Sequence, residues 1–155
     1  MTRIFQAQTD AEIEAARVLF REYETWLNVD LCFQGFEKEL AGLPGKYAPP
    51  AGRLFLATEN EAVAGCVALR QVDEKISEMK RLFVREDFRG SGLGRKLIVR
   101  LIDEARNAGY ERMRLDTLPE RMPAALRLYE ALGFREIEPY YDSPLGSTIF
   151  LELEL

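Results

Sequence analysis

The chain has 155 residues, of which 47% are hydrophobic and 30% charged, and its formal net charge at pH 7 is −5. This composition is typical of one globular domain, and no apolar run approaches the roughly 20 residues that a membrane-spanning helix needs. Histidine is absent, which excludes His-dependent nucleophilic catalysis and His-ligated metals and leaves acid–base chemistry to carboxylates, tyrosine, lysine, cysteine or water.

The first part of the chain predicts a strand and two helices. A short strand over residues 3–6 is followed by Thr9, a good helix cap, and hydrophobic residues then recur at helical spacing over 11–27. A second, short helix is predicted over 36–40.

A loop and a hairpin follow. Prolines and glycines break regular structure over residues 42–52, and a loop of this length in a compact domain is often functional. The apolar segments 54–58 and 62–71 predict an antiparallel hairpin.

The middle of the chain predicts a strand, a glycine-rich turn and a long amphipathic helix. The strand ends at Val84, the turn is Arg89-Gly-Ser-Gly-Leu-Gly94, and the helix ends near Gly109. Three glycines at alternate positions let the backbone approach a ligand where a helix exposes unpaired N–H groups and the positive end of its dipole. The turn is therefore predicted to bind an anion, in particular a phosphate.

The last part predicts a strand over 112–116, a helix over 123–132, and strands over 134–140 and 148–155. The full order, β-α-α-β-β-β-α-β-α-β-β, describes an α/β fold with a mixed sheet, antiparallel at first and parallel across the central βαβ unit. We expect a single domain over residues 1–155. The alternating last strand either fills the sheet or pairs across a two-fold axis in a homodimer.

Charge is unevenly distributed along the chain. Residues 78–114 contain ten Lys and Arg against six Asp and Glu, whereas the rest is acidic. A basic segment in an acidic chain fits a small polyanion better than nucleic acid, although a solvated helix face would give the same imbalance.

The two cysteines, Cys32 and Cys66, are too few for a disulfide framework or a four-thiolate zinc site. The N-terminus also lacks the apolar core of a signal peptide. We therefore expect a cytoplasmic protein with no metal and with neither nucleic acid nor a membrane as partner.

Two common phosphate motifs do not fit the glycine-rich turn. A Walker A loop needs Gly-Lys-Ser/Thr, but Gly94 is followed by Arg95-Lys96-Leu97. A dinucleotide fingerprint needs glycine at the sixth position from Gly90, which is Arg95, although Asp116 does end the next strand.

The spacing that fits is Arg-x-x-Gly-x-Gly, formed by Arg89, Gly92 and Gly94. It resembles the coenzyme A-binding motif of the GNAT N-acetyltransferase superfamily. Downstream, residues 125–134 are similar to the family's Asn-x-x-Ala-x-x-x-Tyr-x-x-x-Gly-Phe, with Met122 at the Asn position. The resemblance implies a single-domain GNAT-like fold whose central βαβ unit binds coenzyme A.

The resemblance implies acetyl-CoA as cosubstrate. Backbone amides of the turn would bind the pyrophosphate, and the main chain of the preceding strand would pair with the pantetheine arm. Arg89 and Arg95 would add charge near the phosphates or remain ordinary exposed arginines. The predicted coenzyme-binding residues are Leu82, Phe83, Val84, Arg89, Gly90, Ser91, Gly92, Leu93, Gly94 and Arg95.

Tyr129 matches the family tyrosine that is proposed to protonate the departing thiolate, and the alternative is a core aromatic. Glu78 and Asp116, at the ends of adjacent strands, are candidate bases; they would alternatively hold an ammonium group or be structural.

In such folds the first helices and the C-terminal hairpin form the acceptor pocket. Unless they belong to the core, its aromatic residues here would be Trp26, Phe33, Tyr47, Tyr140 and Tyr141.

The implied activity is acetyl transfer to a primary amine by direct attack in a ternary complex, with Cys66 as the rival nucleophile. The net negative charge of the residues outside 78–114 slightly favours a small-molecule amine over a protein N-terminus or lysine. The alternative function is a non-catalytic module that senses acyl-CoA.

Overall fold

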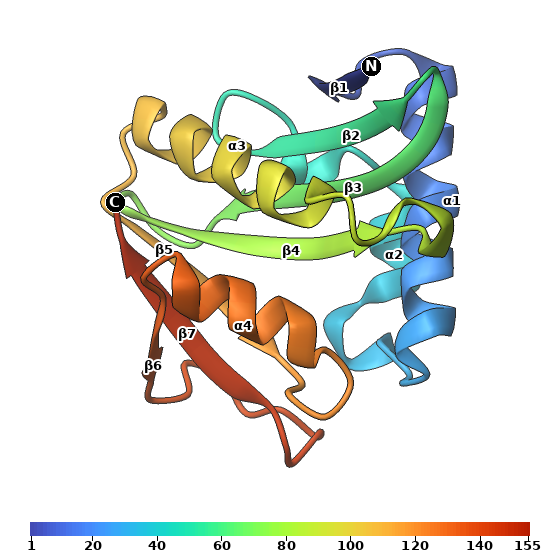
Figure 1. Ribbon diagram of the computed structural model, residues 1–155. Coiled ribbons are helices and arrows are strands. Elements are labelled where there is room, and N and C mark those ends of the chain that lie inside the picture. The colour runs from blue at the N-terminus through green and yellow to red at the C-terminus, as the bar shows by residue number, and fades with distance from the viewer.

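The computed structural model describes residues 1–155 and contains a seven-stranded mixed sheet in the order β1-β2-β3-β4-β5-β7-β6 (Figure 1). The strands are β1 (Thr2–Gln6), β2 (Arg53–Glu59), β3 (Ala62–Gln71), β4 (Ile76–Val84), β5 (Arg112–Thr117), β6 (Arg135–Ile137) and β7 (Ile149–Glu154). The helices are α1 (Asp10–Leu27), α2 (Phe36–Ala41), α3 (Leu93–Asn107) and α4 (Pro123–Ala131). The predicted α/β fold class and order of elements are confirmed.

Local sequence explains how the first elements form. The Thr9 hydroxyl accepts from the Glu12 N–H, and the Glu12 carboxylate accepts from the Thr9 N–H, so a capping box begins α1. The β2–β3 turn places Asn60 and Glu61 at φ 49° and 73°, a two-residue connection whose twist suits a hairpin.

Helices cover both faces of the sheet and divide the core in two. Figure 1 shows α3 and α4 on one face, with α1 and α2 on the other. The α3 residues Leu97, Ile98 and Leu101 are fully buried on the first face, and Leu19 and Phe20 of α1 are fully buried on the second. None of these helices combines the length and hydrophobicity that crossing a bilayer requires.

The central parallel pair of strands is short. β4 and β5 pair only where residues 76–78 face residues 112–114, and beyond that point the strands diverge (Figure 1). A bulge at Arg81, whose φ is 60°, interrupts the pairing of β4 with β3. The end of β4 is therefore bonded to β3 on one side and has a free edge on the other.

The first of the two C-terminal strands is shorter than the sequence predicts. β6 is limited to Arg135–Ile137, whereas the sequence predicts a strand over 134–140. The predicted segment is too long because its end leaves the sheet as a loop that directs Tyr140 and Tyr141 toward carboxylates. β7 is bonded to both β5 and β6, so it fills the sheet and offers no free edge to a second copy. The homodimer stays a prediction that would need another surface.

Candidate active site

The glycine-rich turn presents free backbone N–H groups at the start of α3. Gly90 and Gly92 have φ of 84° and 83°, a conformation that glycine adopts without strain. The backbone N–H groups of residues 90–95 donate to no group within the protein, as expected for a helix N-terminus. The turn lines a groove of about 420 Å³ together with the end of β4 and the start of α4. Such a groove suits a phosphate-bearing ligand.

Most of the predicted coenzyme-binding residues line this groove, namely Leu82, Phe83, Val84, Arg89, Gly90, Gly92, Leu93, Gly94 and Arg95. Ser91 is the exception, and its hydroxyl donates to the Phe88 carbonyl at 2.8 Å. The hydroxyl therefore holds the turn and is not directed at a ligand.

Trp26 and Arg89 form one wall of the same groove. The Arg89 guanidinium lies 4.8 Å from the Trp26 ring centroid and donates to the Val84 carbonyl at 2.8 Å. The Trp26 side chain is 42% exposed and lines the groove. The structure thus places Trp26 beside the predicted coenzyme site, whereas the sequence assigned it to the acceptor pocket.

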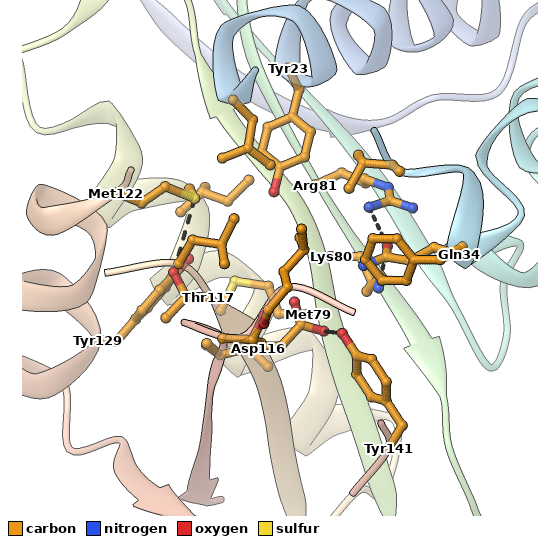
Figure 2. Close-up of a pocket in the computed structure, with 18 residues that line it drawn as sticks. Tyr23, Gln34, Met79, Lys80, Arg81, Asp116, Thr117, Met122, Tyr129 and Tyr141 are labelled. Carbon is orange, nitrogen blue, oxygen red and sulfur yellow. Dashed lines mark hydrogen bonds between the residues drawn. The ribbon is translucent and has the colours of Figure 1, made fainter. Parts of the chain in front are cut away.

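A second, smaller cavity of about 40 Å³ lies where β4 and β5 diverge (Figure 2). Figure 2 shows Tyr23 entering from α1, Tyr129 from α4, and Asp116 and Thr117 from β5. Leu82 and Met122 line both the cavity and the groove. The two spaces are therefore adjacent.

Tyr129 lies on the wall of the cavity. Its side chain is 4% exposed, and its ring packs against Phe134 with centroids 5.6 Å apart. The hydroxyl makes no hydrogen bond within the protein, and the residue lines the cavity. Burial, with smaller effects from Tyr23 and Asp116, raises the pKa of Tyr129 above its usual value. The phenol therefore stays protonated at neutral pH, and the same shift makes it a weaker acid than an exposed tyrosine.

The two predicted carboxylates have different environments. Asp116 lines the cavity and accepts a hydrogen bond of 2.9 Å from the Tyr141 hydroxyl. Glu78 is 1% exposed, lies outside the cavity lining, and accepts from Tyr140 at 2.6 Å and from Arg70 at 2.7 Å. Asp116 is thus the carboxylate that can contact a ligand.

The charges around Glu78 keep it ionised. Burial favours the neutral acid, but Lys80, the Tyr140 hydroxyl and Arg70 outweigh this effect and lower the pKa of Glu78. This carboxylate is therefore a weak base, held by partners that it would have to release before it could accept a proton.

The remaining predicted acceptor-pocket aromatics are not all in one place. Phe33 and Tyr141 line the cavity, and Tyr140 packs behind Tyr141 with ring centroids 5.7 Å apart. Tyr47 is fully buried, packs edge-on against Phe20, and lies outside both the cavity and the groove. It ends the short 3-10 turn Gly45–Tyr47, and its ring belongs to the core beneath α1.

Several cavity residues escaped the sequence analysis, among them Tyr23, Gln34, Lys80 and Arg81. Burial raises the pKa of Tyr23 to about 12. The sequence does contain a signal for Lys80. The charged residues Glu78 and Lys80 flank Met79 in a strand that is mostly buried, and charged residues in such a strand indicate a functional position.

The Cys66 thiol is poorly placed to take part in chemistry here. Cys66 is fully buried, its Sγ lies 3.3 Å from the Arg81 carbonyl, and burial raises the pKa of the thiol. No group of three His, Cys, Asp or Glu side chains is arranged to hold a metal ion.

A mixed sheet that opens between β4 and β5, with an Arg-x-x-Gly-x-Gly turn at the start of the following helix, is the architecture of an N-acetyltransferase. The family model of the acetyltransferase (GNAT) family matches residues 13–134. The chain belongs to this family.

Individual relatives agree with this assignment. The chain is 38% identical to the uncharacterised N-acetyltransferase C1271.07c of Schizosaccharomyces pombe, over 93% of this chain and 89% of the relative. An acetyltransferase structure from Streptococcus agalactiae superposes with a TM-score of 0.80 at 27% identity, covering 99% of this chain and 98% of the other. The fold is also that of yncA of Salmonella typhimurium, solved with its cofactor acetyl-CoA (TM-score 0.72, 24% identity, 99% and 93% coverage).

Proposed function

We propose that this protein transfers the acetyl group of acetyl-CoA to a primary amine by direct attack, with both substrates bound at once. The main support for this proposal is that the groove and the cavity meet. Leu82 and Met122 line both the groove and the cavity, and the Tyr129 hydroxyl opens to the cavity beside them. A thioester in the groove and an amine in the cavity would meet at this point.

The groove suits coenzyme A through its main chain. The free N–H groups of residues 90–95 would bind the pyrophosphate. The edge of β4 at residues 82–84, which pairs with no other strand, would pair with the amide groups of the pantetheine arm as an added strand would, through main-chain groups other than the Val84 carbonyl that accepts from Arg89. The acetyl-CoA named with the Salmonella structure supports this choice of cosubstrate.

The reaction forms a bond between the amine nitrogen and the acetyl carbon and breaks the carbon–sulfur bond. The amine must lose one proton, and the departing thiolate must gain one. We assign Tyr129 to donate the proton to sulfur, and Asp116 to accept the proton from nitrogen, directly or through water. Proton return from Asp116 to the tyrosine through solvent completes the cycle.

Direct attack is favoured over a covalent acetyl-enzyme. Cys66 is fully buried beneath Arg81, and burial keeps its thiol protonated. A buried thiol without an adjacent base is a poor nucleophile.

The cavity favours a small-molecule acceptor over a protein segment, because about 40 Å³ accommodates only a few non-hydrogen atoms. We further propose that the protein works in the cytoplasm. Its two cysteines are both unpaired, and Cys32 is exposed, as is usual in a reducing compartment.

Release of free thiol from acetyl-CoA, measured against a panel of primary amines, tests the proposed function. We expect release that depends on the amine and acetylated amine as the product. Coenzyme-induced thermal stabilisation with no thiol release for any amine would instead support a module that binds acyl-CoA without turnover. Absence of any stabilisation would contradict both.

A further inference from the structure

Lys80 places a positive charge in the wall of the cavity without a carboxylate partner. Its side chain is half-buried and lines the cavity, and its Nζ donates to Gln34 Oε1 at 3.0 Å. No carboxylate oxygen lies within 4.0 Å of Nζ, so Lys80 belongs to no salt bridge. Burying an ammonium group beside a neutral amide alone leaves much of its desolvation cost uncompensated.

The neighbouring charges on β4 are paired with other groups. Arg81 donates twice to the Glu39 carboxylate, at 2.9 and 3.0 Å, and both side chains are buried. Glu78 is held by Arg70 and Tyr140. These pairs leave Lys80 as the cavity cation that has no salt-bridge partner, with Glu78 and Asp116 as the negative charges that act on it from a longer distance.

Asp116 supplies the complementary negative charge on the next strand. It lines the same cavity, and its partner is the neutral hydroxyl of Tyr141. Burial lowers the pKa of Lys80, and the negative charges of Glu78 and Asp116 oppose that shift. Besides Arg81, which is paired with Glu39, the cavity lining therefore contains one positive and one negative group, Lys80 and Asp116, which come from adjacent strands and form no salt bridge with each other (Figure 2).

We propose that the acceptor is a small zwitterion, an amino acid whose carboxylate binds Lys80 while its amino group lies toward Asp116. This inference rests on the proposed function, because it names the substrate class of that site. The ammonium and carboxylate groups of an amino acid, both attached to its α-carbon, match the unpaired cation and anion on the cavity wall. The ammonium loses one proton to solvent before it attacks as the neutral amine. A simple alkylamine would leave Lys80 without an anion in direct contact.

The cavity size restricts the amino acid to a small one. A volume of about 40 Å³ corresponds to about three water positions, which is little more than a carboxylate group, so the carboxylate of glycine or alanine would lie in the cavity while its reactive amine extends toward the groove. A longer side chain would have to displace the loop that carries Tyr140 and Tyr141.

The wild-type enzyme alone tests the proposal with three matched acceptors, alanine, alaninamide and ethylamine, compared by kcat/KM per concentration of free amine. The carboxamide removes the negative charge while it keeps the shape, and ethylamine removes the whole group. We expect alanine to be preferred by about ten- to hundredfold, the range of a charge-assisted hydrogen bond. Equal use of alanine and alaninamide would overturn the inference.

Lys80→Met, which keeps the length of the side chain and removes its charge, tests whether Lys80 causes the preference for alanine over alaninamide. We expect its kcat/KM for alanine to fall about ten- to hundredfold, with little change for alaninamide, and Lys80→Arg to restore the preference. Lys38→Met removes an equal charge from an exposed position of α2 and should change neither. An equal loss for both substrates in Lys80→Met would overturn the role of Lys80.

The same assay separates failure of the inference from failure of the proposed function. Thiol release with ethylamine and alaninamide but not with alanine would leave the acetyltransferase standing and overturn the zwitterionic acceptor. Coenzyme binding without release for any of a broad panel of amines would overturn both.

Discussion

The groove and the cavity are built in different ways. The groove is formed largely by one continuous segment, the end of β4 and the turn before α3, and it offers backbone N–H groups. The cavity is formed by side chains from α1, β4, β5, α4 and the loop before β7. A ligand common to many proteins can be bound by backbone, whereas a particular acceptor has to be selected by side chains.

This difference has a consequence for mutation. The groove should tolerate most side-chain changes and be sensitive to backbone conformation, whereas the cavity should be sensitive to single polar atoms. Substitutions in both regions, each with a matched control, test the distinction.

The largest effect is expected where the two regions meet. Tyr129→Phe removes one hydroxyl that makes no hydrogen bond in the protein and keeps the ring that packs on Phe134. Because general acid catalysis contributes about 10²- to 10⁴-fold, we expect kcat to fall by that factor with an unchanged thermal transition. Steady-state thiol release measures it, and an unchanged kcat would remove Tyr129 from the mechanism.

The ion pair behind the cavity should have the largest effect on folding. Arg81 and Glu39 are both buried, so Glu39→Gln leaves the guanidinium without a counter-charge and should cost about 3–5 kcal/mol of the free energy of unfolding. Urea unfolding at pH 7 measures this cost. Glu37→Gln, which breaks an exposed pair with Arg21, is the control and should have little effect.

The same pair predicts a pH dependence. Burial raises the pKa of Glu39, but Arg81 and Lys46 outweigh this and lower it. A carboxylate with a lowered folded pKa stabilises the protein fully above its unfolded pKa of about 4.3 and loses that contribution as pH falls through the folded value. The stability gap between wild type and Glu39→Gln should be constant above about pH 5 and narrow below pH 4. A constant gap down to pH 2 would contradict the ion-pair account.

The two carboxylates near the cavity should differ in their kinetic effect. Asp116 faces the cavity, so Asp116→Asn should lower kcat/KM for the amine by about 10²-fold while coenzyme affinity is retained. Glu78 is held by Arg70 and Tyr140 outside the cavity lining, and the pH–rate profile of Glu78→Gln should keep the shape of the wild-type profile. A profile that loses its acidic limb in Glu78→Gln alone would exchange the two roles.

Backbone strain in the turn should weaken coenzyme binding, by a smaller factor than the substitutions in the cavity. Gly92→Ala forces a side chain into φ 83° with no steric contact nearby, so the strain of about 1–2 kcal/mol should weaken coenzyme binding about tenfold. Gly109→Ala imposes the same conformation at φ 93° beyond the other end of α3. Isothermal titration should show weaker coenzyme binding only in Gly92→Ala, and equal weakening in both would contradict a local role for the turn.

The sequence predicts the groove better than the cavity, because the groove is built from residues that are neighbours in the sequence, whereas the cavity is built from residues far apart in it. The turn from Arg89 to Gly94 is contiguous, so its glycines and the helix that follows define its geometry locally. Lys80 and Gln34 meet across 46 positions of sequence, and Tyr140 and Glu78 across 62. Such pairs depend on the sheet order and on the bulge at Arg81, which no local pattern specifies.

The sequence also does not distinguish aromatic residues of the core from those of the cavity. Tyr47 and Tyr141 both follow proline- or polar-rich segments, yet one is buried against Phe20 and the other faces Asp116. Only the packing of their loops separates a core residue from a cavity residue.

We propose that the groove and the cavity are filled at the same time and that the acetyl group never resides on the protein. A matrix of initial rates, with acetyl-CoA and the preferred amine varied together, tests this order of events. We expect intersecting double-reciprocal lines, which indicate a ternary complex, and no acetylated Cys66 after incubation with acetyl-CoA alone. Parallel lines together with an acetylated protein would contradict the account.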